Sequence, residues 1–154
     1  MSYNIRPFTA ADIPQLLEMM RALAVFEDYI DGFAMDAETL TRWGLASEAK
    51  FHVFVADDGA DLHAYAACYE IPYTYDARPT LVLKEMYAKP EARGTGAAQG
   101  VMQAVIDKAR DIGAARLHWL VLPDNTRAQR FYRQFGGRPD KKFDNWHITF
   151  DAKS

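Results

Sequence analysis

The chain has 154 residues, of which 49% are hydrophobic and 25% are charged, and its formal net charge at pH 7 is −3. This length and composition suit one folded domain over residues 1–154 and exclude an intrinsically disordered chain, while the mildly acidic balance argues against nucleic-acid binding. No apolar run reaches the ~20 residues of a membrane helix, and a single cysteine excludes an internal disulfide, so we expect a soluble, cytoplasmic protein.

The N-terminal region begins with a short strand that is followed by two helices. Residues 3–8 alternate weakly as a strand, and Thr9 with Asp12 forms a variant capping box that opens a helix. The apolar positions of this helix recur every three or four residues and predict one buried face: Ile13, Leu16, Leu17, Met20, Leu23 and Ala24. A second helix is expected over residues 36–45, with Asp36 as its N-cap.

Glycine, proline, asparagine and aspartate residues mark the ends of most of the remaining elements. We expect strands over residues 51–56, 62–73, 80–88, 115–122 and 143–150, and helices over residues 97–112 and 126–135. The last of these strands rests on alternation alone. The order of strand, two helices, three strands, helix, strand, helix and strand predicts an α/β (α+β) fold with a mixed sheet and helices on both faces.

A glycine-containing run, Arg93-Gly94-Thr95-Gly96-Ala97-Ala98, joins the third long strand to the helix after it. Small residues at such a junction let a ligand approach the backbone, and the first N–H groups of the helix favour a phosphate. A Walker loop is excluded because no Gly-Lys-Ser/Thr follows, and a dinucleotide-binding loop is excluded because its third glycine would fall at Gln99. An ordinary strand-to-helix turn remains the alternative at this point.

Two runs of the sequence resemble the signatures of the GCN5-related N-acetyltransferase (GNAT) family. The run Tyr87-Ala-Lys-Pro-Glu-Ala-Arg93-Gly-Thr-Gly-Ala-Ala98 is similar to the acetyl-CoA signature, with Glu91 in place of its Gln or Arg. The run Asn125-Thr-Arg-Ala-Gln-Arg-Phe-Tyr132-Arg-Gln-Phe-Gly136 is similar to the family pattern Asn-x-x-Ala-x-x-x-Tyr-x-x-x-Gly. The resemblance implies a mainly antiparallel GNAT sheet and an N-acetyltransferase that uses acetyl-CoA as co-substrate and no metal.

Within this family the chain is most similar to the diamine (spermidine/spermine) and thialysine N-acetyltransferases. The matching stretches are Ile5-Arg-Pro, Thr9-Ala-Ala-Asp12, Leu23-Ala-x-Phe-Glu27, Tyr73-Thr-Tyr-Asp76, His118-Trp-Leu-Val121 and Trp146. By this resemblance the protein is a homodimer that acetylates a primary amine of a small molecule by direct attack in a ternary complex. The residues implied in cofactor binding are Met86, Tyr87, Ala88, Arg93, Gly94, Thr95, Gly96, Ala97, Ala98, Gln99, Asn125, Ala128 and Tyr132.

Acetyl transfer requires a neutral amine and a proton for the departing thiolate. Tyr132 is the candidate acid, and backbone N–H groups near Met86 and Tyr87 are expected to stabilise the oxyanion. Tyr132 alternatively packs as an aromatic side chain beside Phe131 and Phe135. Glu85 is the second catalytic candidate. Strand alternation places its side chain on the opposite face of the sheet from that of Lys84, unless a bulge intervenes.

Acidic and aromatic residues are expected to bind the acceptor amine. The resemblance implies substrate contacts at Phe26, Glu27, Lys84, His118, Asp144 and Trp146. The alternatives are a solvated helix end for Glu27, an exposed strand residue for Asp144 and a core or edge histidine for His118. Lys84 replaces the glutamate of the diamine enzymes, and its charge would repel a polyamine but suit an acceptor that carries a carboxylate.

Two other functions remain open after this comparison of motifs. One is acetylation of a protein lysine or N-terminus, and the other is an acyl-CoA-binding regulator with weak catalysis. Neither a nucleic acid nor a membrane is an expected partner. Cys68 lies in an apolar run and is interpreted as a buried strand cysteine rather than a nucleophile.

Overall fold

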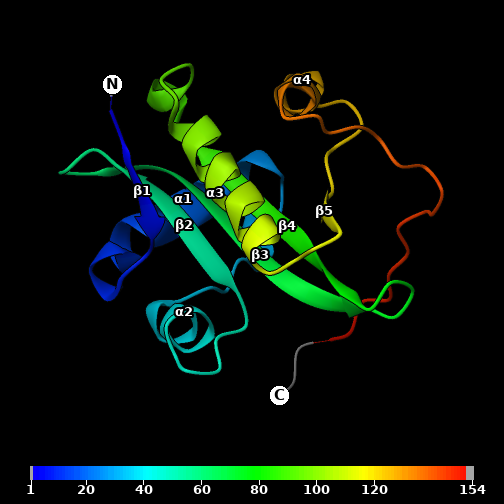
Figure 1. Cartoon of the computed structure of the whole chain (residues 1–154). Helices are drawn as coiled ribbons and strands as arrows, with labels where there is room; N and C mark the ends of the chain where they lie inside the picture. Colours follow the sequence, from blue (N-terminus) through cyan, green and yellow to red (C-terminus); the bar gives the residue numbers. More distant parts are fainter. Residues whose placement is uncertain (1, 152–154) are drawn as a thin grey trace. The chain divides into compact units, whose positions relative to one another are not determined.

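The computed structural model of the chain describes residues 2–151, and its helices and strands follow the predicted order as far as residue 134 (Figure 1). The elements are β1 (Asn4–Pro7), α1 (Ile13–Phe26), α2 (Ala37–Gly44), β2 (His52–Asp57), β3 (Leu62–Tyr73), β4 (Arg78–Ala88), α3 (Ala97–Asp111), β5 (Arg116–Trp119) and α4 (Thr126–Gln134). Short 3-10 turns lie at Ala10–Asp12, Ile30–Gly32 and Pro90–Ala92. The chain forms two compact units, Met1–Trp119 and Leu120–Ser154, and a single domain over residues 1–154 stays a prediction.

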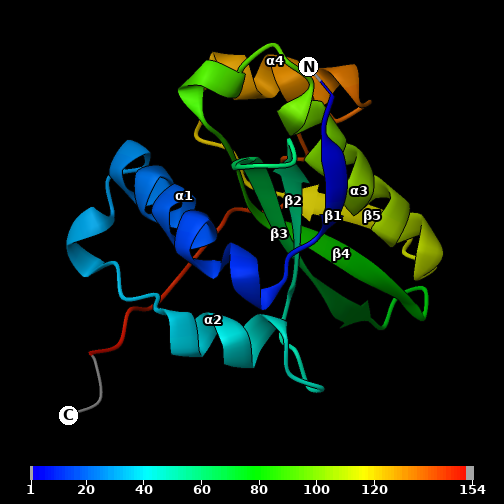
Figure 2. The ribbon, with the colours of Figure 1, turned by 90° about the vertical axis from the view of Figure 1, so that its left-hand side faces the viewer.

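The first unit is built on a five-stranded sheet with the order β1-β2-β3-β4-β5. Neighbouring strands are antiparallel except β4 and β5, which are parallel. The sheet therefore confirms the predicted mixed, mainly antiparallel architecture. Helix α3 lies on one face and helices α1 and α2 on the other, as Figure 2 shows. Within residues 2–151 no helix is both long and apolar enough to cross a membrane.

The main core lies between the sheet and the helices α1 and α2. It is formed by buried side chains that the helical and strand patterns point inward: Phe8, Ile13, Leu16, Met19, Met20, Leu23, Leu40, Val53, Val55, Leu62, Tyr65 and Ala67. On the opposite face α3 lies very close to β1, because a Cβ on Gly100 would come within 2.5 Å of Cδ1 of Ile5. Both faces of the sheet are thus covered by helices that fix its strands in place.

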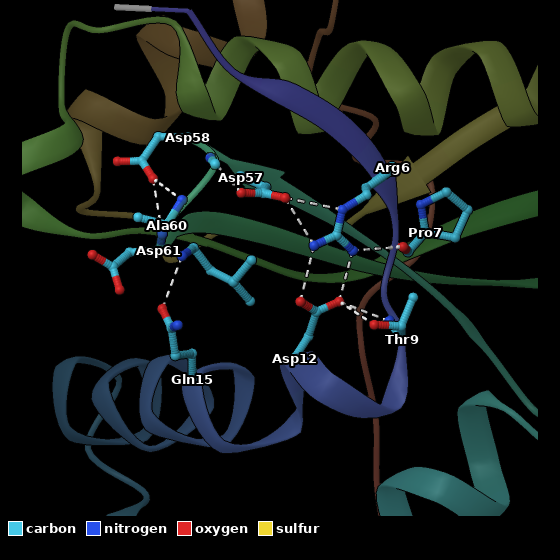
Figure 3. A network of polar contacts seen from close by, with 11 residues as sticks. Arg6, Pro7, Thr9, Asp12, Gln15, Asp57, Asp58, Ala60 and Asp61 are labelled. Atoms are coloured by element: carbon cyan, nitrogen blue, oxygen red, sulfur yellow. Dashed lines mark hydrogen bonds and ion pairs between the residues drawn. The ribbon is translucent and has the colours of Figure 1, made fainter.

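An arginine network ties the first strand to the start of α1 and to the second strand (Figure 3). The Arg6 guanidinium donates to both carboxylate oxygens of Asp12, at 2.7 and 3.0 Å, and to Oδ2 of Asp57 at 2.9 Å. Asp12 also accepts from the backbone N–H of Thr9 at 2.7 Å, which confirms the predicted capping box. The hydrogen bond from Arg6 holds the pKa of Asp12 below its ordinary value. The network therefore connects β1 and β2 to the residue that directly precedes α1.

The C-terminal part differs from the sequence-based prediction. The strand expected over residues 115–122 is shorter, Arg116–Trp119, and the one expected over residues 143–150 is wrong, since that segment forms no strand. Its large apolar side chains are exposed by 76 to 88%: Phe143, Trp146, Ile148 and Phe150. Alternation makes a strand only where a partner strand accepts its backbone hydrogen bonds and a core covers one face. Within residues 2–151 this segment has no partner strand.

Candidate active site

The glycine loop forms the turn between β4 and α3. Gly94 and Gly96 have φ angles of +75° and +99°, the left-handed conformation that favours glycine, and a Cβ at either position would meet open space. Gly96 is the N-cap of α3, and no side chain caps this end of the helix. The first N–H groups of α3 therefore have no side-chain acceptor and can bind an anion such as a diphosphate. Arg93 and Gly94 beside them are exposed.

The edge of β4 that faces β5 is paired along only part of its length. Strand β5 pairs with Thr80–Leu83, and its last partner pair is Leu83 with Trp119. On the other edge, Met86, Tyr87 and Ala88 pair with β3. No strand within residues 2–151 pairs with 84–88 on the side of β5. The backbone of Met86–Ala88 thus has an edge that no described strand covers. Its predicted role in binding acetyl-CoA stays a prediction.

A β-bulge in β4 decides where its charged side chains point. Leu83 pairs with Cys68 and Glu85 pairs with the adjacent Ala67, so Lys84 is an extra residue without a partner. Because of this bulge, Glu85 lies on the same face of the sheet as Tyr65, and its side chain reaches that tyrosine. The sequence alone left the direction of Glu85 dependent on such a bulge, and the structure contains it.

Glu85 is held by a buried hydroxyl. The Tyr65 hydroxyl donates to Oε1 of Glu85 at 2.9 Å, and Tyr65 is completely buried in the core. Burial, followed by the charge of Glu85, raises the pKa of Tyr65 well above its ordinary value, so the phenol remains a donor. The hydrogen bond fixes one carboxylate oxygen of Glu85 and leaves Oε2 for another partner. Tyr65 is not recognisable as a site residue from the sequence, because nothing in its apolar strand distinguishes it from a packing residue.

Further ionisable groups surround Glu85. Glu27 follows the end of α1, and its pKa is raised above the ordinary 4.5 by burial and then by the charge of Glu85, while Lys84 lowers it. Tyr29 lies two residues further on, and burial, with smaller contributions from Glu85 and Glu27, raises its pKa to about 12. We call Glu27, Tyr29, Tyr65, Lys84 and Glu85 the acidic cluster. Its negative charges attract a cationic amine.

Two more predicted substrate residues belong to the same unit. Phe26 ends α1 directly before Glu27 and is 60% exposed, so its ring is accessible to a ligand. His118 is an exposed residue of β5 and lies opposite Val82, two residues before Lys84 on β4. The register therefore places His118 one strand away from the acidic cluster. His118 lies on β5, an edge strand of the sheet, and it is exposed, so it is not a core residue.

The remaining predicted site residues lie in the second unit. The Asn125 side chain accepts from the backbone N–H of Ala128 at 3.1 Å and so caps α4. The ring of Tyr132 lies 5.5 Å from that of Phe131, in the aromatic packing that was the alternative to a catalytic role. Asp144 and Trp146 are exposed. The roles of these residues toward the glycine loop and the acidic cluster stay predictions.

Cys68 does not supply a nucleophile to this site. It is fully buried in β3, and burial raises the pKa of its thiol to about 11, so the reactive thiolate is disfavoured. This confirms the interpretation of Cys68 as a core residue. Within the described residues, no three side chains among His, Cys, Asp and Glu gather as a metal-binding group.

Comparison with known proteins identifies the family. Residues 16–137 match the acetyltransferase (GNAT) family. A thialysine N-epsilon-acetyltransferase of Sus scrofa is 29% identical over 154 residues, covering 95% of this chain and 90% of that protein. A thialysine N-epsilon-acetyltransferase of Caenorhabditis elegans is 28% identical over 133 residues, covering 85% of this chain and 80% of that protein.

Solved structures agree on the fold. An aminoglycoside acetyltransferase from an uncultured soil metagenomic sample has a TM-score of 0.80 and 15% identity, with 97% of each chain covered. A probable acetyltransferase has a TM-score of 0.76 and 20% identity, with 97% of this chain and 99% of the other covered. With its sheet, its glycine loop and the family match over residues 16–137, this chain belongs to the acetyltransferase (GNAT) family and is an N-acetyltransferase.

Proposed function

We propose that this N-acetyltransferase moves the acetyl group of acetyl-CoA to a primary amine of a small, amino-acid-like molecule by direct attack in a ternary complex. The observation that carries the proposal is the bulge at Lys84, because it turns the Glu85 carboxylate to the face of Tyr65, where the charges of both Glu85 and Lys84 act on Glu27. The glycine loop fits the diphosphate of acetyl-CoA, since its two left-handed glycines expose uncapped N–H groups.

The acceptor amine must lose a proton before it attacks, because an alkylammonium with a pKa of ~10 is charged at pH 7. Glu85 is the proposed base: Tyr65 orients its carboxylate through Oε1 and leaves Oε2 for the amine. The neutral nitrogen then forms a bond to the thioester carbon, and the carbonyl oxygen takes up negative charge. Backbone N–H groups of Met86–Ala88 are the proposed donors to this oxygen.

The attacking nitrogen then carries an extra proton, which it releases to solvent, and collapse of the tetrahedral intermediate breaks the carbon–sulfur bond to give the neutral amide and the thiolate of coenzyme A. A thiol has a reference pKa of ~8.5, so a weak acid is sufficient to protonate it. We assign this proton to the Tyr132 hydroxyl, as the resemblance implies. Asn125 and Ala128 on the same helix are the proposed cofactor-lining residues, with the backbone of Ala128 bound to the Asn125 side chain.

The charges of the acidic cluster indicate the class of acceptor. Glu27 and Glu85 attract an ammonium group, whereas Lys84 opposes a second one and attracts a carboxylate. An amino acid with an amine in its side chain carries both charges, and a polyamine carries only positive ones. Relatives named thialysine N-epsilon-acetyltransferases support an amino-acid acceptor. Phe26, His118, Asp144 and Trp146 are the remaining proposed contacts, and a homodimer stays part of the proposal.

The test measures release of free thiol from acetyl-CoA in the presence of three acceptor classes: diamino acids, polyamines and lysine-containing peptides. We expect the highest kcat/KM with a diamino acid and identify the product as its side-chain N-acetyl derivative by mass spectrometry. Highest activity with peptides would instead favour a protein acetyltransferase. Binding of coenzyme A without turnover of any acceptor would favour a regulator, and absence of coenzyme A binding would overturn the proposal.

A further inference from the structure

A side chain from the start of the chain contacts the glycine loop. The Tyr3 hydroxyl lies 2.7 Å from Oγ1 of Thr95, although the two residues are 92 positions apart in the sequence. Thr95 stands between Gly94 and Gly96, the two residues of the loop with left-handed backbones. Thr95, which has a side chain between these two glycines, is therefore held by a residue from outside the loop.

The direction of this hydrogen bond follows from the other partner of Thr95. The Thr95 hydroxyl donates its only proton to the carbonyl of Ala92, and the backbone N–H of Thr95 donates to the same oxygen at 3.2 Å. The hydroxyl of Thr95 is thus left as an acceptor, so Tyr3 is the donor. Together the three bonds fix Thr95 at its backbone and at its side chain.

The ring of Tyr3 is itself supported by a second set of contacts. It packs against the ring of His63 in β3, with 5.5 Å between the ring centroids. His63 is bonded through Nε2 to Oδ2 of Asp58 at 2.7 Å, and its carbonyl accepts from the N–H of Lys89 at 2.9 Å. Asp58 in turn accepts from the turn residues Ala60 and Asp61 (Figure 3). These contacts connect the turn between β2 and β3 to the glycine loop.

We propose that Tyr3 is a positioning residue for coenzyme binding: its hydrogen bond to Thr95 holds the glycine loop in the conformation that presents N–H groups to the diphosphate. The inference rests on the proposed function of the loop. Glycines lose more conformational entropy than other residues when they are ordered, so a loop with two of them binds a ligand more tightly when it is ordered in advance.

Calorimetric titration of the full chain with coenzyme A tests this role. Tyr3→Phe keeps the ring and its contact with His63 but removes the donor, and Thr95→Val removes the acceptor together with the bond from Thr95 to the Ala92 carbonyl. We expect Tyr3→Phe to bind coenzyme A ~3–10-fold more weakly than the wild type, the range of one neutral hydrogen bond, and Thr95→Val to bind it at least as weakly as Tyr3→Phe. The double variant is expected to be no weaker than Thr95→Val, because that variant already lacks the bond to Tyr3. Thr95→Ser retains a hydroxyl and is expected to restore the affinity.

Matched controls separate positioning from folding. Tyr75→Phe removes a hydroxyl from a tyrosine that is 83% exposed, and it is expected to leave the dissociation constant unchanged. The thermal unfolding midpoints of Tyr3→Phe and the wild type are expected to agree, and the KM for the amine is expected to stay the same. An unchanged dissociation constant for Tyr3→Phe, or additive losses in the double variant, would overturn the role of Tyr3. Failure of the wild type to bind coenzyme A would overturn the proposed function as well.

Discussion

The glycine loop at one end of β4 and the acidic cluster around its bulge are built from different kinds of groups. The loop presents backbone N–H groups from a few consecutive residues, with φ angles that its glycines allow. The cluster presents side chains from the end of α1, from β3 and from β4, which meet only after the sheet has formed. A site made of backbone is therefore robust to most substitutions outside its glycines, whereas a site made of side chains changes with a single charge.

The largest effect is expected at the base of the acidic cluster. Glu85→Gln removes the charge but keeps an oxygen that can accept from Tyr65, so the geometry of the bulge is retained. We expect kcat/KM for the amine to fall by ~10²-fold or more, the usual contribution of a general base. The dissociation constant of coenzyme A is expected to stay unchanged. Glu70→Gln, an exposed residue of β3, is the matched control, and equal activity of the two variants would remove Glu85 from the mechanism.

Tyr132 tests whether the second unit contributes to the chemistry. Tyr132→Phe keeps the ring packed beside Phe131 and removes the hydroxyl. A lost general acid is expected to lower kcat by ~10²-fold while the affinity for coenzyme A stays the same. Steady-state kinetics with calorimetry provides both values. A kcat equal to that of the wild type would contradict the role of Tyr132 as general acid.

The backbone of the loop is tested by Gly96→Val. Open space surrounds a Cβ at this position, so the substitution acts through the φ of +99° and not through a clash. A β-branched residue in this conformation costs ~1–3 kcal/mol, which predicts ~10–100-fold weaker binding of coenzyme A in a calorimetric titration. Gly32→Val, at a glycine that is also surrounded by open space but lacks a positive φ, is the control. If Gly96→Val and Gly32→Val bind coenzyme A equally well, the conformation of the glycine loop does not determine the affinity for coenzyme A.

A single charge in the acidic cluster is expected to change the preferred acceptor. Lys84→Glu replaces the ammonium at the bulge by a carboxylate, which attracts a second cation and repels a carboxylate. We expect the ratio of kcat/KM for spermidine to that for a diamino acid to rise ~10-fold or more. Lys50→Glu is the control, because it makes the same change of charge at an exposed position before β2. A ratio that changes equally in both variants would show a general effect of net charge.

The smallest effect concerns pH. Burial and the charge of Glu85 raise the pKa of Glu27 above its ordinary 4.5, so Glu27 loses its charge at a higher pH than an ordinary glutamate when the solution is acidified. The KM for a cationic acceptor is therefore expected to rise by about two- to fivefold as the pH falls through this range. Glu27→Gln is expected to have the higher KM already at neutral pH and a flatter profile. A wild-type profile as flat as that of Glu27→Gln would contradict the role of Glu27.

The contrast between the glycine loop and the acidic cluster explains what the sequence could predict. The position of the glycine loop between β4 and α3, the capping box at Thr9 and the lengths of most elements depend on neighbouring residues, and these predictions are confirmed, whereas the binding role of the loop stays a prediction. Tyr65 and Tyr3 were missed because their partners, Glu85 and Thr95, are distant in the sequence and their register is set by the sheet. The strand expected over residues 143–150 failed for a related reason: alternation describes a segment but does not supply a partner strand.

The unpaired edge of β4 also has a consequence for handling the protein. Residues 84–88 have no partner strand on one side within the described chain, and such an edge is a template on which another polypeptide can add by backbone pairing. In the proposed function the backbone of Met86–Ala88 binds coenzyme A, so a bound coenzyme would cover part of this edge. Coenzyme A added during purification is therefore expected to slow deuterium uptake at residues 84–88 and to reduce self-association on storage.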